Sequence, residues 1–272
     1  MKLSESSDLN PQENVNYAQM NRSVAYRLSN NLPAAIADAS AVIKRGTDDP
    51  RVYLTRAEMF AENGDWEESV QDRKTGLELR PKDDIGWMTR SHARLGESPR
   101  DAIKDLQRAL TITTSPRKIR ENLAYIHAEV LKDPEKAVRI LSDSLDSDPT
   151  DIITRAGRGV LLARVGRTET ALADAKVLLQ SELDALTRYQ VACIYALLSR
   201  NDETHQQTAI QLLAQSLIED LRILNHVDSD PDIAPIRDLE QVEDLIAACK
   251  RIRELAEADQ VKKHQDGRKK QE

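Results

Sequence analysis

The stretch LTRAEMFAENGDWEESVQDRKTGL, residues 54–77, decides the fold of this chain. The stretches MNRSVAYRLSNNLPAAIADASAVI (residues 20–43) and AGRGVLLARVGRTETALADAKVLL (residues 156–179) share its layout. Each has an Arg followed by a small residue, an apolar stretch, a turn that contains Asn or Gly, and a small residue that opens a second apolar stretch. This layout predicts a repeated unit of two helices joined by a turn.

The repeated unit has a period of 34 residues. The Arg of each unit and its equivalents fall at Arg22, Arg56, Arg90, Ala124, Arg158 and Ala192. Small residues mark the second helices at Ala35, Ser69, Ala102, Ala137, Ala171 and Ala209. Residues that tolerate a positive φ stand at the inner turns, namely Asn30, Gly64, Gly96 and Gly166. Helix-ending prolines follow the second helices at Pro50, Pro81, Pro116 and Pro149.

The composition agrees with a helical protein. The 272 residues carry a net charge of −7 and are 40% hydrophobic but only 3% aromatic, with 9 Gly and 10 Pro. The core must therefore use Ala, Leu, Ile and Val, which favours helices packed on helices. Two Cys do not suffice for a disulfide scaffold. Residues 1–15 have no apolar core like that of a signal peptide, and no run approaches the roughly 18 apolar residues of a membrane helix. We expect an all-α cytoplasmic protein.

The pattern resembles tetratricopeptide repeats (TPRs) over residues 16–219. In the second unit the matching residues are Tyr53, Ala57, Phe60, Gly64, Trp66, Ser69, Leu77 and Pro81. In the fifth unit they are Gly159, Leu162, Gly166, Ala171 and Leu178. The third unit departs from the pattern, with a shortened first helix and Arg94 where an apolar residue is usual. The resemblance implies an α-solenoid of about six TPR helical hairpins.

Different segments are expected to flank the repeats. Residues 1–15 form a polar leader and residues 259–272 a basic polar tail, and we expect both to be disordered. Residues 220–258 are expected to form a closing unit with a C-terminal capping helix. The apolar stripe of that helix is Leu239, Val242, Leu245, Ile246, Cys249, Ile252 and Leu255.

The C-terminal part carries a second resemblance. The strings ACIYALLS (residues 192–199) and DPDIAPIRDLEQVEDLI (residues 230–246) resemble the closing unit of TPR regions attached to planctomycete-type bacterial Ser/Thr protein kinases. The sequence contains no Gly-rich phosphate loop, HRD or DFG motif, so no ATP chemistry follows from that resemblance.

A pair of opposite charges recurs with the repeat. An Arg and an Asp are 16 residues apart in three units and 15 apart in the shortened unit, as Arg22 with Asp38, Arg56 with Asp72, Arg158 with Asp174, and Arg90 with Asp105. The separation places the two side chains on facing helices of one hairpin, where a guanidinium donates two hydrogen bonds to a carboxylate. We expect structural ion pairs. An arginine-lined groove for anionic peptides or phosphates is the alternative.

The TPR resemblance implies that first helices line a concave groove. The candidate lining residues are Met20, Val24, Leu54, Glu58, Met88, His92, Asn122, Ile126, Ala156, Val160, Gln190 and Ile194. The alternative is that many of them pack between repeats. Chaperone-binding TPR proteins carry a carboxylate clamp of Lys and Asn on one first helix, Asn on the next, and Lys and Arg on the third. The corresponding positions here are Met20, Val24, Thr55, Ile85 and Thr89. We therefore expect a peptide or helix with apolar anchors rather than an acidic chaperone C-terminus.

Catalytic and metal-binding patterns are missing from the sequence. The five His residues are scattered, and Cys193 and Cys249 lie on apolar helical stripes. Asp228, Asp230 and Asp232 are expected in a solvated turn. The basic tail has no interleaved aromatic residues, which disfavours nucleic acid.

We expect a non-catalytic protein-interaction scaffold with no cofactor and no metal. A regulatory TPR arm or partner subunit of a bacterial Ser/Thr kinase system is the alternative. Self-association through the first repeat stays open, because the polar leader would not cover an apolar end.

Overall fold

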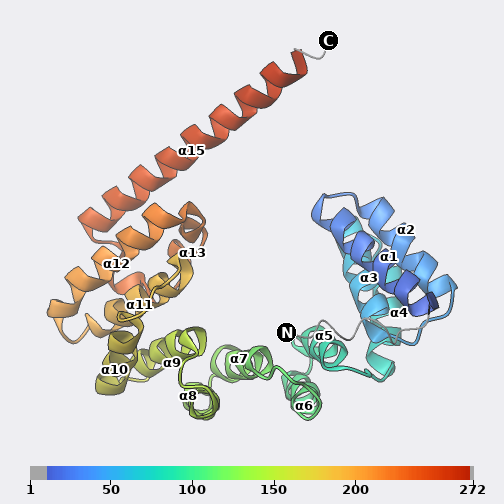
Figure 1. Ribbon diagram of the computed structural model, residues 1–272, viewed down its shortest axis with the longest axis horizontal. Helices are drawn as coiled ribbons and strands as arrows, with labels where there is room; N and C mark the ends of the chain where they lie inside the picture. Colours follow the sequence, from blue (N-terminus) through green and yellow to red (C-terminus); the bar gives the residue numbers. More distant parts are fainter. Residues whose placement is uncertain (1–10, 270–272) are drawn as a thin grey trace. The chain divides into compact units, whose positions relative to one another are not determined.

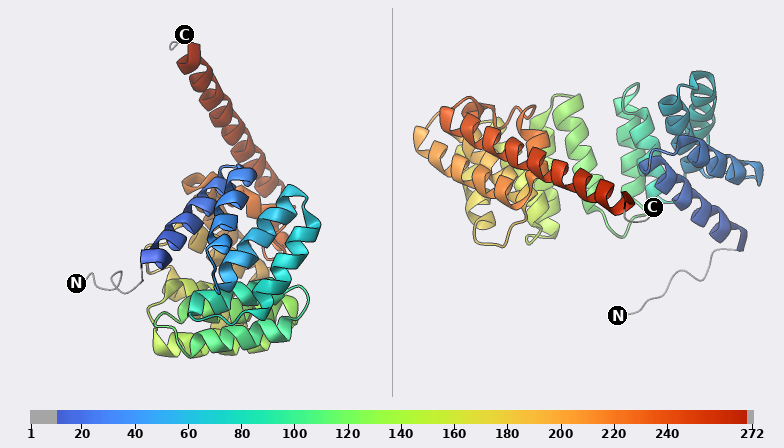
Figure 2. Two further views of the ribbon diagram at one scale, coloured as in Figure 1. Left: turned by 90° about the vertical axis from the view of Figure 1, so that its right-hand side faces the viewer. Right: turned by 90° about the horizontal axis from the view of Figure 1, so that it is seen from above.

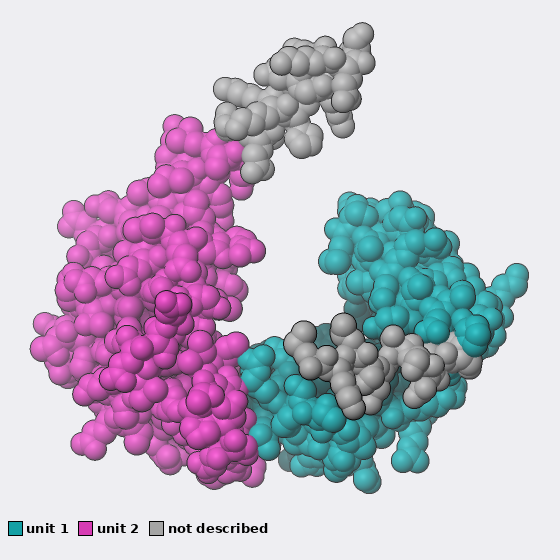
Figure 3. All heavy atoms as spheres, viewed as in Figure 1, with its two compact units in different colours: residues 1–126 teal, residues 127–272 magenta. Residues whose placement is uncertain are grey.

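A computed structural model describes residues 11–269, with side chains described through residue 258. Helices are the regular structure of these residues, and no strand occurs among them. The chain divides into two compact units, Met1–Ile126 and His127–Glu272 (Figure 3).

Unit 1 is built from helical hairpins. Its described part contains α1 (Pro11–Leu28), α2 (Leu32–Lys44), α3 (Pro50–Asn63), α4 (Trp66–Glu78), α5 (Asp84–Arg94), α6 (Pro99–Leu110) and α7 (Arg117–Tyr125). The helices α1 and α2, α3 and α4, and α5 and α6 pack as pairs (Figure 1). These are the first three hairpins predicted from the 34-residue period, and α5 is the short first helix expected in the third.

Unit 2 continues the helical pattern and adds short helices. It contains α8 (Pro134–Ser147), α9 (Ile152–Arg164), α10 (Thr168–Leu178), α11 (Ala185–Leu198), α12 (Gln206–Glu219), α13 (Leu224–Val227), α14 (Ala234–Arg237) and α15 (Glu240–Lys269). A π-helical turn spans Ile126–Val130, and 3-10 turns span Glu203–His205 and Leu221–Ile223. The hairpins α9–α10 and α11–α12 are the fifth and sixth predicted ones. The fourth repeat is divided between the two compact units. Its first helix, α7, belongs to unit 1, and its second helix, α8, belongs to unit 2.

Local chemistry sets the helix ends. Asn30, Gly64 and Gly166 have φ values of 60°, 90° and 77° at the inner turns, as expected from their tolerance of the left-handed region. Gly96, expected to behave in the same way, does not have a positive φ. Asp184 caps α11, because its Oδ1 accepts a hydrogen bond from the backbone N–H three residues later at 2.7 Å.

Small residues on the second helices occupy the centre of the core. Every alanine predicted to mark a second helix has no exposed surface, namely Ala35, Ala102, Ala137, Ala171 and Ala209. The remaining marker, Ser69, is half-buried and donates a hydrogen bond from Oγ to the carbonyl of Ala57 at 2.7 Å. Small side chains therefore let the paired helices approach closely.

Both ends of the chain differ from the expected boundaries. Helix α1 begins at Pro11, so residues 11–15 of the expected polar leader are helical, while residues 1–10 lie outside the described residues. Helix α15 continues to Lys269, so most of the expected disordered tail has a helical backbone (Figure 2). Gln, Lys and Arg are frequent in residues 259–269 and no Pro interrupts them, and these three residue types have high helix propensity.

The predicted capping stripe is buried over its first half. Val242, Ile246 and Cys249 of α15 are buried against the rest of unit 2. Ile252 and Leu255 are 56% and 58% exposed. The helix therefore covers the end of the repeat array with its first turns and continues past it.

Candidate protein-interaction surface

The first helices of unit 1 present apolar side chains to solvent. In α1, Tyr17, Val24 and Leu28 are 59%, 39% and 84% exposed, and Met20 is half-buried between them. These residues are three or four positions apart, so they form one stripe along the helix. Ile85 of α5, 57% exposed, stands two periods after Tyr17. We call these residues the first-helix surface of unit 1, together with the side chains at further equivalent positions, Glu58, Glu62, Met88 and His92.

A charged cluster joins α1 to α3 on this surface. The Nε of Arg27 donates to the two carboxylate oxygens of Glu62 at 3.1 and 3.0 Å. Its Nη1 donates to Oε2 of Glu58 at 2.7 Å. Arg27 is adjacent to Val24 and Leu28 along α1, so apolar side chains and charges of both signs share the surface. Water screens these charges, and the cluster contributes little to stability.

The twelve groove positions fall into two groups. Exposed or half-buried side chains are those of Met20, Val24, Glu58, Met88, His92, Asn122 and Gln190. Buried side chains, at 8% exposure or less, are those of Leu54, Ile126, Ala156, Val160 and Ile194. The buried group takes part in packing, which is the alternative role considered for these positions. The groove list omitted Tyr17 and Leu28, although the spacing of apolar residues along α1 marks both.

Close helix contacts explain two of the buried positions. A Cβ placed on Gly76 of α4 would lie 2.7 Å from Cγ of Leu54 in α3. A Cβ on Gly159 of α9 would lie 2.5 Å from Cδ1 of Ile194 in α11. Each large side chain therefore fills the space that a glycine leaves on the facing helix.

The recurring Arg and Asp side chains are in contact. Arg56 donates from Nε to Oδ2 of Asp72 at 2.6 Å and from Nη2 to Oδ1 at 2.8 Å. The same two-bond arrangement joins Arg22 to Asp38, Arg90 to Asp105 and Arg158 to Asp174. Since the Arg lies on the first helix and the Asp on the second, each pair links the two helices of one hairpin.

The pairs differ in their exposure to solvent. The side chain of Arg22 is 59% exposed, whereas those of Arg56 and Arg90 are 16% and 10% exposed. Hydrogen bonding from Arg22, with a smaller contribution from Gln19, holds the pKa of Asp38 below its ordinary value. The pairs of Arg56 and Arg90 therefore present little guanidinium surface to an anionic ligand.

Two further arginines join these pairs. Arg94, at the position where an apolar residue is usual, donates from Nη1 to Oδ2 of Asp105 at 2.9 Å. Arg155 donates from Nη1 to Oδ1 of Asp174 at 3.0 Å. The carboxylates of Asp105 and Asp174 thus each accept hydrogen bonds from two guanidinium groups. The repeat pattern contains one Arg position per unit, and the second arginine lies outside that position.

Two serines extend the pairs to a neighbouring second helix. Arg56 donates from Nη1 to Oγ of Ser40 in α2 at 2.9 Å. Arg158 makes the corresponding bond to Ser142 in α8 at 3.4 Å. Each serine precedes its arginine by 16 residues, so the spacing that predicted the Asp partners also contained this signal.

A second polar cluster lies in unit 2. Arg164, at the end of α9, donates from Nε and Nη2 to the two oxygens of Asp232 at 2.7 and 2.6 Å. Its Nη1 donates to the carboxylate of Glu129. The hydroxyl of Tyr189 in α11 donates to Oδ2 of Asp230 at 3.0 Å. These contacts bind the segment between α13 and α14 to α9 and α11.

Burial dominates the electrostatics of this cluster. Burial raises the pKa of Asp232, and the hydrogen bonds from Arg164 oppose that rise. The expectation that Asp232 lies in a solvated turn is wrong, because this side chain is buried against Arg164. Burial, followed by the charge of Asp230, raises the pKa of the Cys193 thiol. A buried, protonated thiol is a poor nucleophile, in line with a packing role for Cys193.

The described residues contain neither a metal-binding cluster nor a membrane-spanning helix. No group of three or more His, Cys, Asp and Glu side chains within that part of the chain is placed to hold a metal ion. Within the same part, none of the helices combines the length and apolar character needed to cross a membrane. The side chain of His264 lies outside the described ones.

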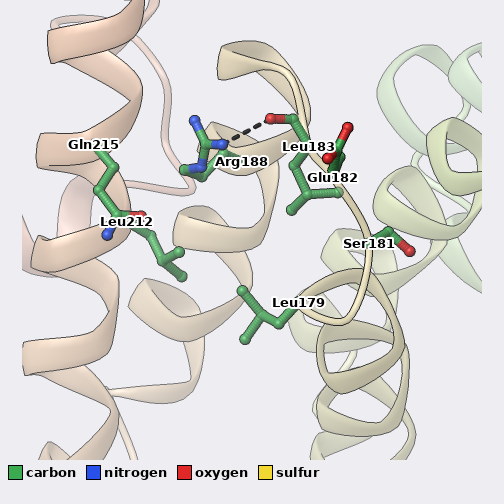
Figure 4. Close-up of a pocket in the computed structure, with 7 residues that line it drawn as sticks. All are labelled: Leu179, Ser181, Glu182, Leu183, Arg188, Leu212 and Gln215. Atoms are coloured by element: carbon green, nitrogen blue, oxygen red, sulfur yellow. Dashed lines mark hydrogen bonds between the residues drawn. The ribbon is translucent and has the colours of Figure 1, made fainter.

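A surface pocket of about 450 Å³ lies in unit 2 where α10 ends and α11 begins (Figure 4). Its lining consists of Leu179, Ser181, Glu182, Leu183, Arg188, Leu212 and Gln215. Arg188 donates from Nη2 to the carbonyl of Leu183 at 2.7 Å and from Nη1 to the carboxylate of Glu219. The guanidinium is thus held by the protein itself, and the lining contains no His or Cys for catalysis.

Comparison with solved structures identifies the fold. A tetratricopeptide repeat protein from Parabacteroides merdae is 17% identical, with a TM-score of 0.53 over 90% of this chain and 87% of that chain. PilW, a type IV pilus biogenesis factor, is 14% identical, with a TM-score of 0.55 over 84% of this chain and 99% of its own. The chain has the tetratricopeptide-repeat fold.

Another match among TPR-like solved structures is a chain of the Cut9–Hcn1 hetero-tetramer of the APC/C. It is 15% identical, with a TM-score of 0.50, and the alignment covers 90% of the present chain and 43% of that longer chain. No protein-family model matches the sequence, and no curated protein matches it either. The TPR relationship is therefore one of fold.

Proposed function

We propose that this TPR chain is a non-catalytic scaffold that binds a peptide or helix of a protein partner on the first-helix surface of unit 1. The observation that carries the proposal is the solvent exposure of Tyr17, Val24 and Leu28 along α1 and of Ile85, the equivalent of Tyr17, on α5. Large apolar side chains gathered on one surface mark sites of protein interaction. One structural neighbour is itself part of a hetero-tetramer with another protein, which supports the same class of function.

The surface favours a partner of mixed character. Exposed apolar side chains of α1 and α5 can contact apolar anchors of a partner, and Arg27, Glu58 and Glu62 provide charges of both signs on the same surface. An amphipathic helix or an extended segment with alternating apolar and polar residues matches this arrangement.

The experiment is selection of peptides from a random display library by the full chain, followed by fluorescence anisotropy with the enriched peptides. A Val24→Glu, Leu28→Glu, Ile85→Glu variant should lose at least about tenfold in affinity, because each buried apolar anchor contributes about 1.5–3 kcal/mol. An Ile218→Glu variant is the matched control, since Ile218 is 79% exposed on α12 of unit 2. Equal binding by the triple variant and the parent would refute the proposal.

The closing unit supports a second candidate function, as a regulatory arm or partner subunit of a bacterial Ser/Thr kinase system. The two strings that resemble kinase-linked TPR regions contact each other, because the thiol of Cys193 lies 3.9 Å from the carboxylate of Asp230. The test is whether a kinase reading frame lies within or directly beside the gene. A kinase-free neighbourhood in every genome that encodes the chain would reject this candidate.

A further inference from the structure

The segment from residue 228 to residue 237 lies on the first helices of unit 2. Asp232 binds Arg164 of α9 through two hydrogen bonds, and Asp230 binds Tyr189 of α11 through one. Ile233 has no exposed surface, so it serves as an apolar anchor between the polar contacts and α14. The next anchor, Ile236, is in α14, which packs on α11 and α12.

One of these contacts exceeds what a repeat array requires. In a solenoid each repeat contacts its immediate neighbours, so a segment that only closes the sixth hairpin would touch α11 and α12. The bond from Asp232 to Arg164 instead reaches α9, in the fifth hairpin, across 68 residues of sequence. The segment therefore reaches past the sixth hairpin to a first helix of the fifth.

The segment is attached as a bound peptide would be. Its backbone N–H groups make local bonds: those of Ser229 and Asp230 donate to the carbonyl of His226, and those of Ile236 and Arg237 donate to that of Ile233. Its polar contacts with α9 and α11 come from two side chains, the carboxylates of Asp232 and Asp230. A buried ion pair of this kind favours one partner over another more than it adds stability, because burying both charges costs solvation energy.

We propose that residues 228–237 are an internal ligand that occupies a peptide-binding surface of unit 2 formed by α9 and α11. The ligand class that this surface recognises is an acidic segment with two carboxylates two residues apart and an isoleucine directly after the second. A protein partner that presents such a segment displaces residues 228–237 and takes their place. This inference concerns unit 2 and does not depend on ligand binding by unit 1.

Complementation in trans tests the proposal. The receptor is the full chain with Asp232→Ala and Ile233→Ser, in which the internal segment is weakened while α9 and α11 keep their residues. The probe is a fluorescein-labelled peptide of residues 226–238, HVDSDPDIAPIRD. We expect anisotropy to show binding to this variant at least about tenfold tighter than to the parent chain, whose tethered segment competes at a high effective concentration.

Two controls show which contacts are responsible. Adding Arg164→Met to the receptor variant should weaken probe binding at least about tenfold, because the probe loses the partner of its second carboxylate. A probe peptide with Asp232→Asn should bind similarly weakly to the receptor variant that keeps Arg164. Equal binding to the parent and the variant, or absence of binding to a variant that retains its helical circular dichroism, would overturn the proposal.

Hydrogen exchange on the parent chain provides a test without any substitution. Amides of residues 228–237 should exchange at least about tenfold faster than those of α11, because an internal ligand dissociates without unfolding its receptor. Equal protection of residues 228–237 and of α11 would show that the segment belongs to the cooperative core, and the proposal would fail. This test uses only the parent chain, so it does not depend on whether the variants fold. Loss of peptide binding by the Val24, Leu28 and Ile85 variant would leave this result unchanged, so the two proposals fail separately.

Discussion

Removal of Arg56 should destabilise the chain more than removal of Arg56 and Asp72 together. In Arg56→Ala the carboxylate of Asp72, whose side chain is 8% exposed, loses bonds of 2.6 and 2.8 Å. Breaking a buried pair by removing one partner costs about 3–5 kcal/mol, and the partial exposure of Arg56 places the expected loss near 3 kcal/mol. In Arg56→Met, Asp72→Leu both charges are replaced by apolar groups of similar size, so no unpaired charge remains.

Urea and thermal unfolding followed by circular dichroism measure both variants. The single variant should have the lower free energy of unfolding and a Tm several degrees below that of the double variant. Arg22→Ala is the matched control, since Arg22 makes the same two bonds but is 59% exposed, and its effect should be smaller than that of Arg56→Ala. Equal stabilities of the single and double variants, or an equal effect of Arg22→Ala, would refute the reasoning from charge burial.

Three further outcomes follow from the packing of unit 2. Gly159→Ala should destabilise by about 1–3 kcal/mol in urea unfolding, because the new methyl would lie 2.5 Å from Ile194 Cδ1, whereas Gly157→Ala, with its nearest neighbour at 3.7 Å, should be neutral or slightly stabilising. Asp184→Ala should cost about 1 kcal/mol as a lost N-cap. Hydrogen bonds from the first turn of α11 lower the pKa of Asp184, so this contribution is present above about pH 4 and is lost as pH falls through the native pKa, which an acid titration of both proteins would show. The Cys193 thiol, buried and with a raised pKa, should react with a thiol reagent at the rate of unfolding, and fast labelling of the native chain would contradict its burial.

The hairpins could be predicted from the sequence because their contacts are local. Both partners of the Arg56–Asp72 pair belong to one unit, so a fixed spacing of 16 residues encodes the contact. The inner turns depend on the conformational freedom of single residues such as Gly64, which a sequence displays directly. The TPR fold follows from these local features and from their repetition every 34 residues.

The exposure of the candidate surface could not be predicted in the same way. Met20 and Leu54 are one period apart, yet Met20 is half-buried and Leu54 is 3% exposed. On the facing helix Gly76 leaves room for Leu54, whereas the residue equivalent to Gly76 in the first repeat is Val42. Whether a first-helix residue faces solvent therefore depends on a pair of side chains from two helices, not on one position of the repeat.

The sequence by itself determined the number and type of the repeated hairpins, the inner turns at Asn30, Gly64 and Gly166 and the Arg–Asp pairs, because each depends on residues within one period. The tertiary structure decided the burial of Asp232 on Arg164, two residues that lie 68 positions apart with helices α10 to α13 between them. No period relates these two residues, and the path of the chain after α12 brings them together. Burial then makes Asp232 part of a polar contact that its sequence, next to a proline in an acidic turn, does not indicate.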